Sequence, residues 1–318
     1  MKVSSGTAGL GLALLSAATF GTSGPFASSL LAAGWTAGAA VTVRVVIATA
    51  ALTVPALFAL RGRFGQLRRG SGTVAIYGIV AVAGAQLGYF NAVQHLSVAV
   101  ALLLEYSGVL LVVGWMWARH GHRPGRLTAL GGLGALVGLA LVLDLLGSRD
   151  VDLVGVLWGL GAAVGLAVYY VVSSHNEDAL PPIVVAWGGL AVGAVALLLA
   201  GAVGVLPLAA SRTDVVLASR HMSWLVPVLG MSLLAAAFAY VAGILGARRL
   251  GARVASFVGL TEVLFAVLFA WLLLGQTPRP VQLVWGLLVV VGIALVRLGE
   301  RPEVTEAQPG PLLAVADA

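Results

Sequence analysis

Three ionisable side chains stand inside long apolar runs of the chain, namely Arg44, Glu105 and Glu262. A charged group at the centre of a bilayer costs about 2.5–3.5 kcal/mol on insertion scales, so residues of this kind usually serve a function. A carboxylate at this depth can bind a cationic group of a substrate, or take up and release a proton that couples transport. The structural alternative is a buried carboxylate that pairs with Arg44 and fixes the packing of helices.

Polar and aromatic side chains in other runs could complete a binding pocket around these charges. Gln86, Tyr89 and, less strictly, Asn91 fall on one stripe of a helix. The rings of Tyr170 and Tyr240 could stack on a substrate or hydrogen-bond to it. The alternative for each residue is a hydrogen bond between helices, about 0.6 kcal/mol on average, or anchoring at the membrane interface.

Other chemistry finds little support in the sequence. The chain has no cysteine, no HExxH motif and no Walker A lysine, and its apolar runs hold no paired aspartates. The two histidines of His120-Gly121-His122 have no carboxylate or thiol near them and fit a solvated basic loop. We therefore expect no enzymatic activity, no cofactor and no metal. A membrane-embedded enzyme or a channel acting on a small molecule is the alternative.

Composition places most of the chain in lipid. Of its 318 residues, 60% are hydrophobic and 9% are charged, with a mean hydropathy of +1.04. A soluble protein carries about 25% charged residues. The apolar runs are continuous and long enough for helices that cross a ~30 Å core. We predict an all-α membrane protein with ten transmembrane helices, at 8–32, 36–60, 73–93, 97–117, 127–146, 153–174, 182–206, 223–246, 252–274 and 279–298.

The basic residues set the orientation of these spans. With a cytoplasmic N-terminus, 13 of the 18 basic residues lie on the cytoplasmic side and 4 on the outer side, with Arg44 inside a span. The positive-inside rule favours this arrangement. We expect a multi-pass protein of the cell membrane with both termini cytoplasmic and a disordered tail at 300–318. Because the basic residues sit in short loops, we expect no nucleic-acid partner.

The chain repeats itself at an offset of 154 residues. In this frame Leu96–Val142 lies on Leu250–Val296 without a gap, and residues of distinctive type coincide: Trp117 with Trp271, Gly121 with Gly275, and Pro124 with Pro278. We therefore predict two five-helix repeats, residues 1–146 and 147–299. Five is an odd number, so the second repeat is inverted, as in many secondary transporters with a substrate site near the midplane.

Several segments make the chain resemble EamA-type members of the drug/metabolite transporter superfamily. They are Phe20–Ser23 (FGTS), Arg44, Ala101–Gly108 (ALLLEYSG), Leu260–Glu262 (LTE) and Leu274–Gln276 (LGQ). The resemblance covers nearly the whole chain. It implies a ten-span carrier of small metabolites, which are often moved outward.

The sequence departs from the family pattern at two positions. Gln276 stands where the family usually has Glu, and Val109 stands where many relatives have Pro. Without that proline, a break in the helix at Val109 is not expected. The stretch Leu96–Gly108 is also similar to its counterpart in bacterial threonine/homoserine exporters, which favours an amino acid as the substrate.

Taken together, these features predict a secondary active transporter that works by alternating access. We expect it to move a small metabolite, an amino acid or related compound, outward across the cytoplasmic membrane. Two deep glutamates would allow coupling to protons. The expected partners are the small-molecule substrate and the lipid bilayer, and the glycine-rich faces of spans 5 and 10 are candidates for contact within a homodimer.

Overall fold

The computed structural model describes residues 5–96, 98–120, 152–174 and 180–277, with the single positions 130, 131, 134, 280, 284, 287 and 291. The described chain is mostly helical. Its elements in order are α1 (Ser5–Gly21), α2 (Ser23–Ala32), α3 (Ala37–Leu60), α4 (Phe64–Arg69), α5 (Ser71–Ile76), η1 (Tyr77–Gly84), α6 (Ala85–His95), α7 (Val98–Tyr106), α8 (Gly108–His120), α10 (Leu153–Ser174), α11 (Pro182–Ala202), β1 (Val215–Leu217), β2 (Arg220–Met222), α12 (Leu225–Leu229), η2 (Gly230–Phe238), α13 (Ala239–Gly259) and α14 (Thr261–Leu274).

Seven helical stretches in this part of the chain are long and apolar enough to cross a membrane: Gly6–Ala32, Ala37–Leu60, Ser71–His95, Val100–Arg119, Leu153–Ser174, Pro182–Ala202 and Leu225–Gly259. The first six overlap, in order, predicted spans one to four, six and seven. The seventh holds predicted span eight and the start of span nine. The predicted spans at 127–146 and 279–298, apart from isolated positions, and the tail at 300–318 lie outside the described residues.

The stretch Leu225–Gly259 is two helices joined at a kink. Gly251 has φ 77° and ψ 160°, a conformation outside the helical region that glycine adopts easily. The residues after it continue through Leu260 into α14, a shorter apolar helix. The kink at Gly251 therefore separates predicted span 223–246 from predicted span 252–274.

Two π-helical segments recur in the 154-residue frame. The segment η1 (Tyr77–Gly84) precedes α6, and η2 (Gly230–Phe238) precedes α13. Adding 154 to the bounds of η1 gives 231–238, which falls inside η2. Because π-helical turns are rare, their recurrence at equivalent positions extends the repeat beyond the segments Leu96–Val142 and Leu250–Val296.

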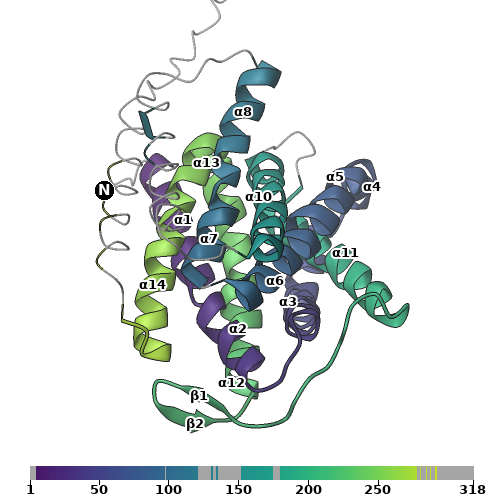
Figure 1. The fold of residues 1–318 in the computed structure, drawn as a ribbon. Helices are drawn as coiled ribbons and strands as arrows, with labels where there is room; N and C mark the ends of the chain where they lie inside the picture. The colour runs from purple at the N-terminus through teal and green to yellow at the C-terminus, as the bar shows by residue number, and fades with distance from the viewer. Residues whose placement is uncertain are drawn as a thin grey trace, which may run out of the picture.

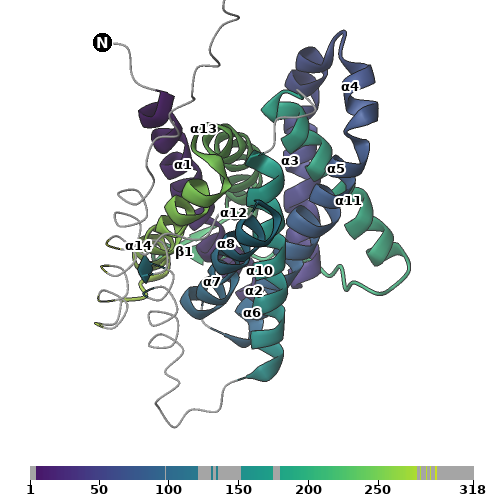
Figure 2. The same ribbon diagram turned by 90° about the horizontal axis from the view of Figure 1, so that it is seen from above.

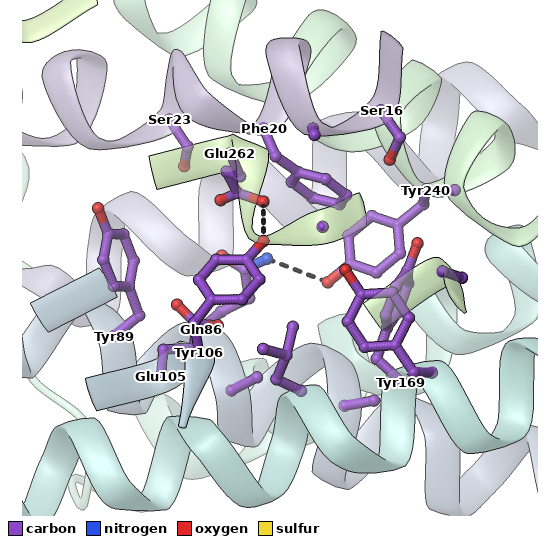
Figure 3. Close-up of a pocket in the computed structure, with 18 of the residues that line it drawn as sticks. Ser16, Phe20, Ser23, Gln86, Tyr89, Glu105, Tyr106, Tyr169, Tyr240 and Glu262 are labelled. Carbon is purple, nitrogen blue, oxygen red and sulfur yellow. Dashed lines mark hydrogen bonds between the residues drawn. The ribbon is translucent and has the colours of Figure 1, made fainter. Parts of the chain in front are cut away.

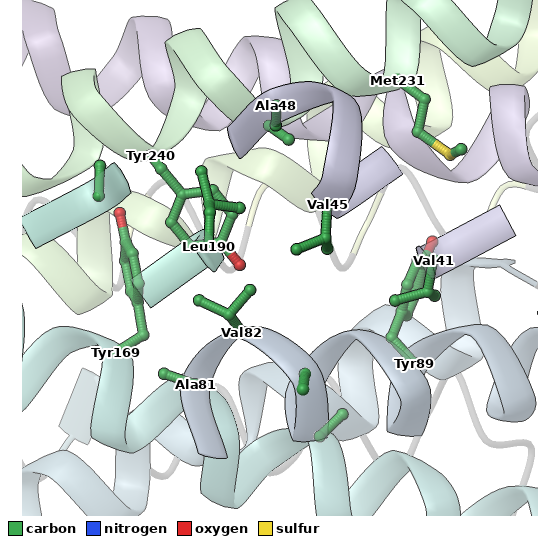
Figure 4. Packing of buried hydrophobic residues seen from close by; sticks show 14 of the residues in the cluster. Val41, Val45, Ala48, Ala81, Val82, Tyr89, Tyr169, Leu190, Met231 and Tyr240 are labelled. Carbon is green, nitrogen blue, oxygen red and sulfur yellow. The ribbon is translucent and has the colours of Figure 1, made fainter. Parts of the chain in front are cut away.

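The helices enclose a core of small apolar side chains. In Figures 1 and 2, α1 and α14 lie on one side, α3, α5 and α11 lie on the other, and α10 runs between them. Figure 4 shows the packing in the interior, where Val41, Val45, Val82, Leu190 and Met231 are all at most 1% exposed. This packing holds the polar cavity described below between helices from both halves of the sequence.

A short β-hairpin closes the lower edge of the molecule in Figure 1. Strands β1 and β2 pair antiparallel, and the two residues between them, Ala218 and Ser219, have φ of 51° and 58°. Such a turn normally carries Asn-Gly or Asp-Gly, so the sequence did not predict it. The Ala218 N–H donates to the Leu273 carbonyl at 2.7 Å, which fastens the hairpin to the end of α14.

An exposed carboxylate begins α10. Asp152 accepts hydrogen bonds from the backbone N–H groups of Gly155 (3.1 Å) and Val154 (2.9 Å). Its other oxygen lies 2.9 Å from Nδ1 of His95, at the end of α6. The bond from Gly155 first, and then that from His95, lower the pKa of Asp152 because they favour its charged form. The pair links the ends of two neighbouring helices.

Close contact between η1 and α11 requires glycine. A methyl group on Gly78 would lie 2.6 Å from the carbonyl oxygen of Gly189 and from Cβ of Val192. Gly78→Ala should therefore overpack this contact and lower the free energy of unfolding by about 1–3 kcal/mol. Gly72→Ala is the matched control, because nothing lies within 4 Å of the added methyl group. Thermal unfolding of the two variants in detergent measures the difference, and equal melting temperatures would contradict this packing.

Candidate functional site

A cavity between the helices brings most of the predicted site residues together (Figure 3). Its empty space, with the adjoining open solvent counted in, is about 730 Å³. Side chains from α1, α2, α3, η1, α6 and α7, before residue 146, and from α10, α13 and α14, after it, line the cavity. The predicted site residues at this cavity are Arg44, Gln86, Glu105, Tyr170, Tyr240 and Glu262.

Helix breaks position the two glutamates. Helices α7 and α8 meet at Ser107, whose hydroxyl donates to the Leu104 carbonyl at 2.6 Å. Helices α13 and α14 meet at Leu260, where the Thr261 hydroxyl donates to the Val258 carbonyl at 2.7 Å. Such bonds compete with the helical ladder. In the 154-residue frame Ser107 corresponds to Thr261 and Leu104 to Val258, so the two breaks are equivalent.

The absence of proline at Val109 led us to expect no break there, and the chain instead breaks two residues earlier. At this junction of α7 and α8, the chain also packs closely against α10, in addition to the hydrogen bond of the Ser107 hydroxyl. A methyl group on Gly108 would overlap the carbonyl oxygen of Ala163 in α10. A serine followed by a glycine can therefore interrupt this helix without a proline.

Arg44 is almost fully buried, at 1% exposure, and its partners are neutral. One terminal nitrogen donates to Ser23 Oγ at 2.6 Å and to Gln86 Oε1 at 2.7 Å, and the other donates to the carbonyl oxygen of Ala235. The ring of Phe90 lies 5.9 Å from the guanidinium carbon. Within the described residues no carboxylate forms a salt bridge with Arg44, so this conformation does not support the structural alternative of an Arg44–carboxylate pair.

Two hydrogen bonds cross between the halves of the sequence inside the cavity. The Tyr106 hydroxyl donates to Glu262 Oε2 at 2.6 Å, and the Gln86 amide donates to the Tyr240 hydroxyl at 3.0 Å. Both bonds are drawn in Figure 3. Gln86 and Tyr240 are 154 residues apart, so they occupy equivalent positions of the predicted repeats. The structure thus links the halves at the centre of the cavity.

The two glutamates differ in their partners. Glu262 accepts the bond from Tyr106, whereas no hydrogen bond or ion pair reaches the Glu105 carboxyl group from the described residues. The hydroxyl of Tyr89, which also lines the cavity, is buried and lacks a partner among the same residues. Tyr169 lines the cavity with a hydroxyl in the same situation, so Glu105, Tyr89 and Tyr169 are the groups most available to a bound molecule or proton.

Aromatic rings form the opposite wall. The ring of Tyr240 lies 5.1 Å from that of Phe20 and 5.7 Å from that of Tyr169, both edge to face. Tyr169 also stands 4.9 Å from Tyr170. The spacing is typical of favourable aromatic pairs. This cluster gives the cavity an apolar surface with several hydroxyl groups at its margin.

A kink between α1 and α2 brings Phe20 and Ser23 to the cavity. The chain departs from the helix at Thr22, three residues before Pro25. Pro25 has no N–H to bond the carbonyl one turn earlier, which weakens the ladder at this point. At the same kink, the Thr22 hydroxyl donates to the Thr19 carbonyl at 2.7 Å.

Asn91 lies outside the cavity. Its amide nitrogen donates to the Leu87 carbonyl at 2.7 Å, one turn back in α6. At about 100° per residue, Asn91 is roughly 140° around the helix from Gln86, so the two cannot share a face. Sequence reasoning also missed Tyr106, whose only signal was its place beside Glu105, and Ser16, which bonds the Ala239 carbonyl at 2.8 Å.

The contacts of Arg44 predict its effect on stability. Arg44→Met would remove one donor group from three buried acceptors, and each unpaired acceptor costs about 1–3 kcal/mol. The variant should unfold at a clearly lower temperature in detergent. Arg63→Met is the matched control, because Arg63 is exposed at the start of α4 and should leave the melting temperature unchanged. An Arg44→Met protein as stable as the parent would show that the network contributes little.

Comparison with known proteins adds a family and a fold. The model of the EamA-like transporter family matches residues 7–144 and 153–298. The fold is similar to that of a solved crystal structure with a TM-score of 0.62 and 22% identity, covering 95% of this chain and 100% of the other. At that identity the similarity shows the fold alone. The comparison with curated proteins gives no match.

Proposed function

Because the chain belongs to the EamA-like transporter family, we propose that it is a secondary active transporter of a small metabolite in the cell membrane. The observation that carries this proposal is the cavity shared by both halves of the sequence, with a carboxylate beside a helix break on each side. Broken helices at a shared central site are common in secondary transporters.

We place ten spans in two inverted repeats, residues 1–146 and 147–299, with both termini cytoplasmic. The equivalent positions of η1 and η2, and of Ser107 and Thr261 at the two helix breaks, support this arrangement. In alternating access the two repeats rock against each other around a fixed site. Each of two hydrogen bonds, Tyr106–Glu262 and Gln86–Tyr240, joins one proposed repeat to the other. Both bonds would therefore break or change partners when the repeats move against each other.

Glu105 and Glu262 are the proposed sites for a cationic group of the substrate or for a coupling proton. Their unequal partners suggest unequal roles, since Glu105 is free to bind and Glu262 is held by Tyr106. Arg44 orients Ser23 and Gln86 around them. We propose outward transport of an amino acid or a related compound, exchanged for protons. The similarity to threonine/homoserine exporters stays a prediction.

Metabolite profiling tests this function. Cells that overproduce the protein should accumulate one class of metabolite in the medium, whereas cells with Glu105→Gln plus Glu262→Gln at equal level in the membrane should not. The reason is that neutral amides can neither hold a proton nor pair with a cation. Mass spectrometry of medium and cell contents gives the readout, with Asp214→Asn, an exposed carboxylate in the described structure, as the control.

If intact and double-variant strains match each other and an empty-vector strain, outward transport of common metabolites is wrong. Depletion of a compound from the medium by the intact protein alone would keep the transporter and reverse its direction. Equal accumulation with the intact protein and with the double variant would keep the transporter and remove the carboxylates from its mechanism.

A further inference from the structure

The cavity has two chemically different ends. In Figure 3, Glu262, Glu105 and Tyr89 lie toward the left, and Tyr169, Tyr240 and Ser16 lie toward the right. Phe20 stands between them, its ring against that of Tyr240. A ligand that fills the space would therefore meet charge at one end and aromatic surface at the other. The two ends call for an amphipathic small molecule.

The charges at the polar end do not balance. The charged side chains that line the cavity are Arg44, Glu105 and Glu262. With all three ionised the cavity carries one surplus negative charge. An unpaired charge away from water is costly, so the surplus favours the entry of one positive charge. A proton or a monovalent organic cation would supply it.

The cation of the protein is not available to a ligand. Arg44 is 1% exposed, and its terminal nitrogens already donate to Ser23, Gln86 and the Ala235 carbonyl. Its Nε is buried without a partner among the described residues. A ligand carboxylate could pair with Arg44 only after these bonds were broken. The cavity in this conformation therefore offers no ready site for an anion.

The free charged group is Glu105. Glu262 already accepts the Tyr106 hydroxyl, whereas the Glu105 carboxyl group has no partner in the described part of the chain. A carboxylate suits an ammonium group, which donates up to three hydrogen bonds. The hydroxyl of Tyr89, unpaired and buried, can accept one of them.

The aromatic end suits the rest of such a ligand. The rings of Phe20, Tyr169 and Tyr240 pack edge to face with their centres 5.1–6.4 Å apart, and they line the cavity together with small residues such as Ala81 and Ala85. Aromatic rings bind apolar bodies by burial and attract nearby cations through their faces. An apolar body on this wall would complement an ammonium group at Glu105, which lines the same cavity.

From these observations we infer that the cavity binds a monovalent organic cation, a primary or secondary ammonium on an apolar body about one aromatic ring in size. The ammonium group pairs with Glu105, and the body packs on Phe20, Tyr169 and Tyr240. This inference rests on the proposed transport function and names its substrate class. It narrows the class to amines without a carboxylate, since Arg44 is occupied.

Three probes that share one body and differ in charge test the inference. They are 2-phenylethylamine, a cation, 3-phenylpropanoate, an anion, and phenylalanine, a zwitterion. Binding to the full-length protein in detergent is measured by isothermal titration calorimetry at neutral pH. We expect 2-phenylethylamine to bind at least tenfold more tightly than either other probe. Glu105→Gln should weaken its binding at least tenfold, and Asp214→Asn should leave it unchanged.

A second variant covers the case in which Glu105→Gln fails to fold. Phe20→Leu keeps an apolar side chain but removes one aromatic face, and it should weaken binding of the amine by about 3- to 30-fold. The inference is overturned if the anion or the zwitterion binds as tightly as the amine, if none of the three binds, or if the amine binds a folded Glu105→Gln protein as well as the parent.

Failure of this inference and failure of the proposed function give different results. Export of an anion or a zwitterion in metabolite profiling, with no binding of the amine, keeps the transporter and rejects the cation site. Glu105-dependent binding of the amine, with no movement of it across the membrane of proteoliposomes, keeps the site and counts against transport.

Discussion

In hydrocarbon every backbone N–H and C=O group has to be paired inside the protein, and this constraint governs the rest of the structure. It explains why the described chain is mostly continuous helix and why the interruptions matter. The breaks at Thr22, Ser107 and Leu260 each adjoin a residue that lines the cavity. At all three, a threonine or serine hydroxyl bonds a carbonyl of the preceding turn. At these three breaks, irregular backbone therefore coincides with a side chain that can bond a carbonyl of the interrupted helix.

The same constraint shapes the electrostatics of the interior. A guanidinium group is buried among a hydroxyl, an amide and a carbonyl, so its charge is solvated by dipoles rather than neutralised by a carboxylate. Neither glutamate is paired with this guanidinium group, and the two have different partners. Glu262 accepts a hydrogen bond from Tyr106, whereas Glu105 is open to the cavity. The chemistry of the site follows from which groups are already occupied as much as from which groups are present.

Much of this could be predicted from apolar periodicity and from charge placed where charge is costly. Glu105, Glu262 and Arg44 were found because each interrupts an apolar run. Contacts between distant segments could not be predicted, since nothing local marks the Tyr106–Glu262 bond across 156 residues. The hairpin at Ala218 and Ser219 was not predicted because its turn lacks the usual glycine. Asn91 was placed on the cavity face of its helix, but a polar side chain can also bond a carbonyl of its own helix, as Asn91 does.

The two halves of the sequence carry different residues at one pair of equivalent positions that line the cavity. In the 154-residue frame Glu105 corresponds to Gly259, where even a methyl group would overlap the hydroxyl of Tyr170. One half therefore places a carboxylate at this position, and the other half leaves room for a tyrosine from α10. Two identical copies of a five-helix unit would carry the same residue at both places. Because the halves are joined in one polypeptide, each can carry a different residue at an equivalent position, and the two sides of the cavity differ in chemistry.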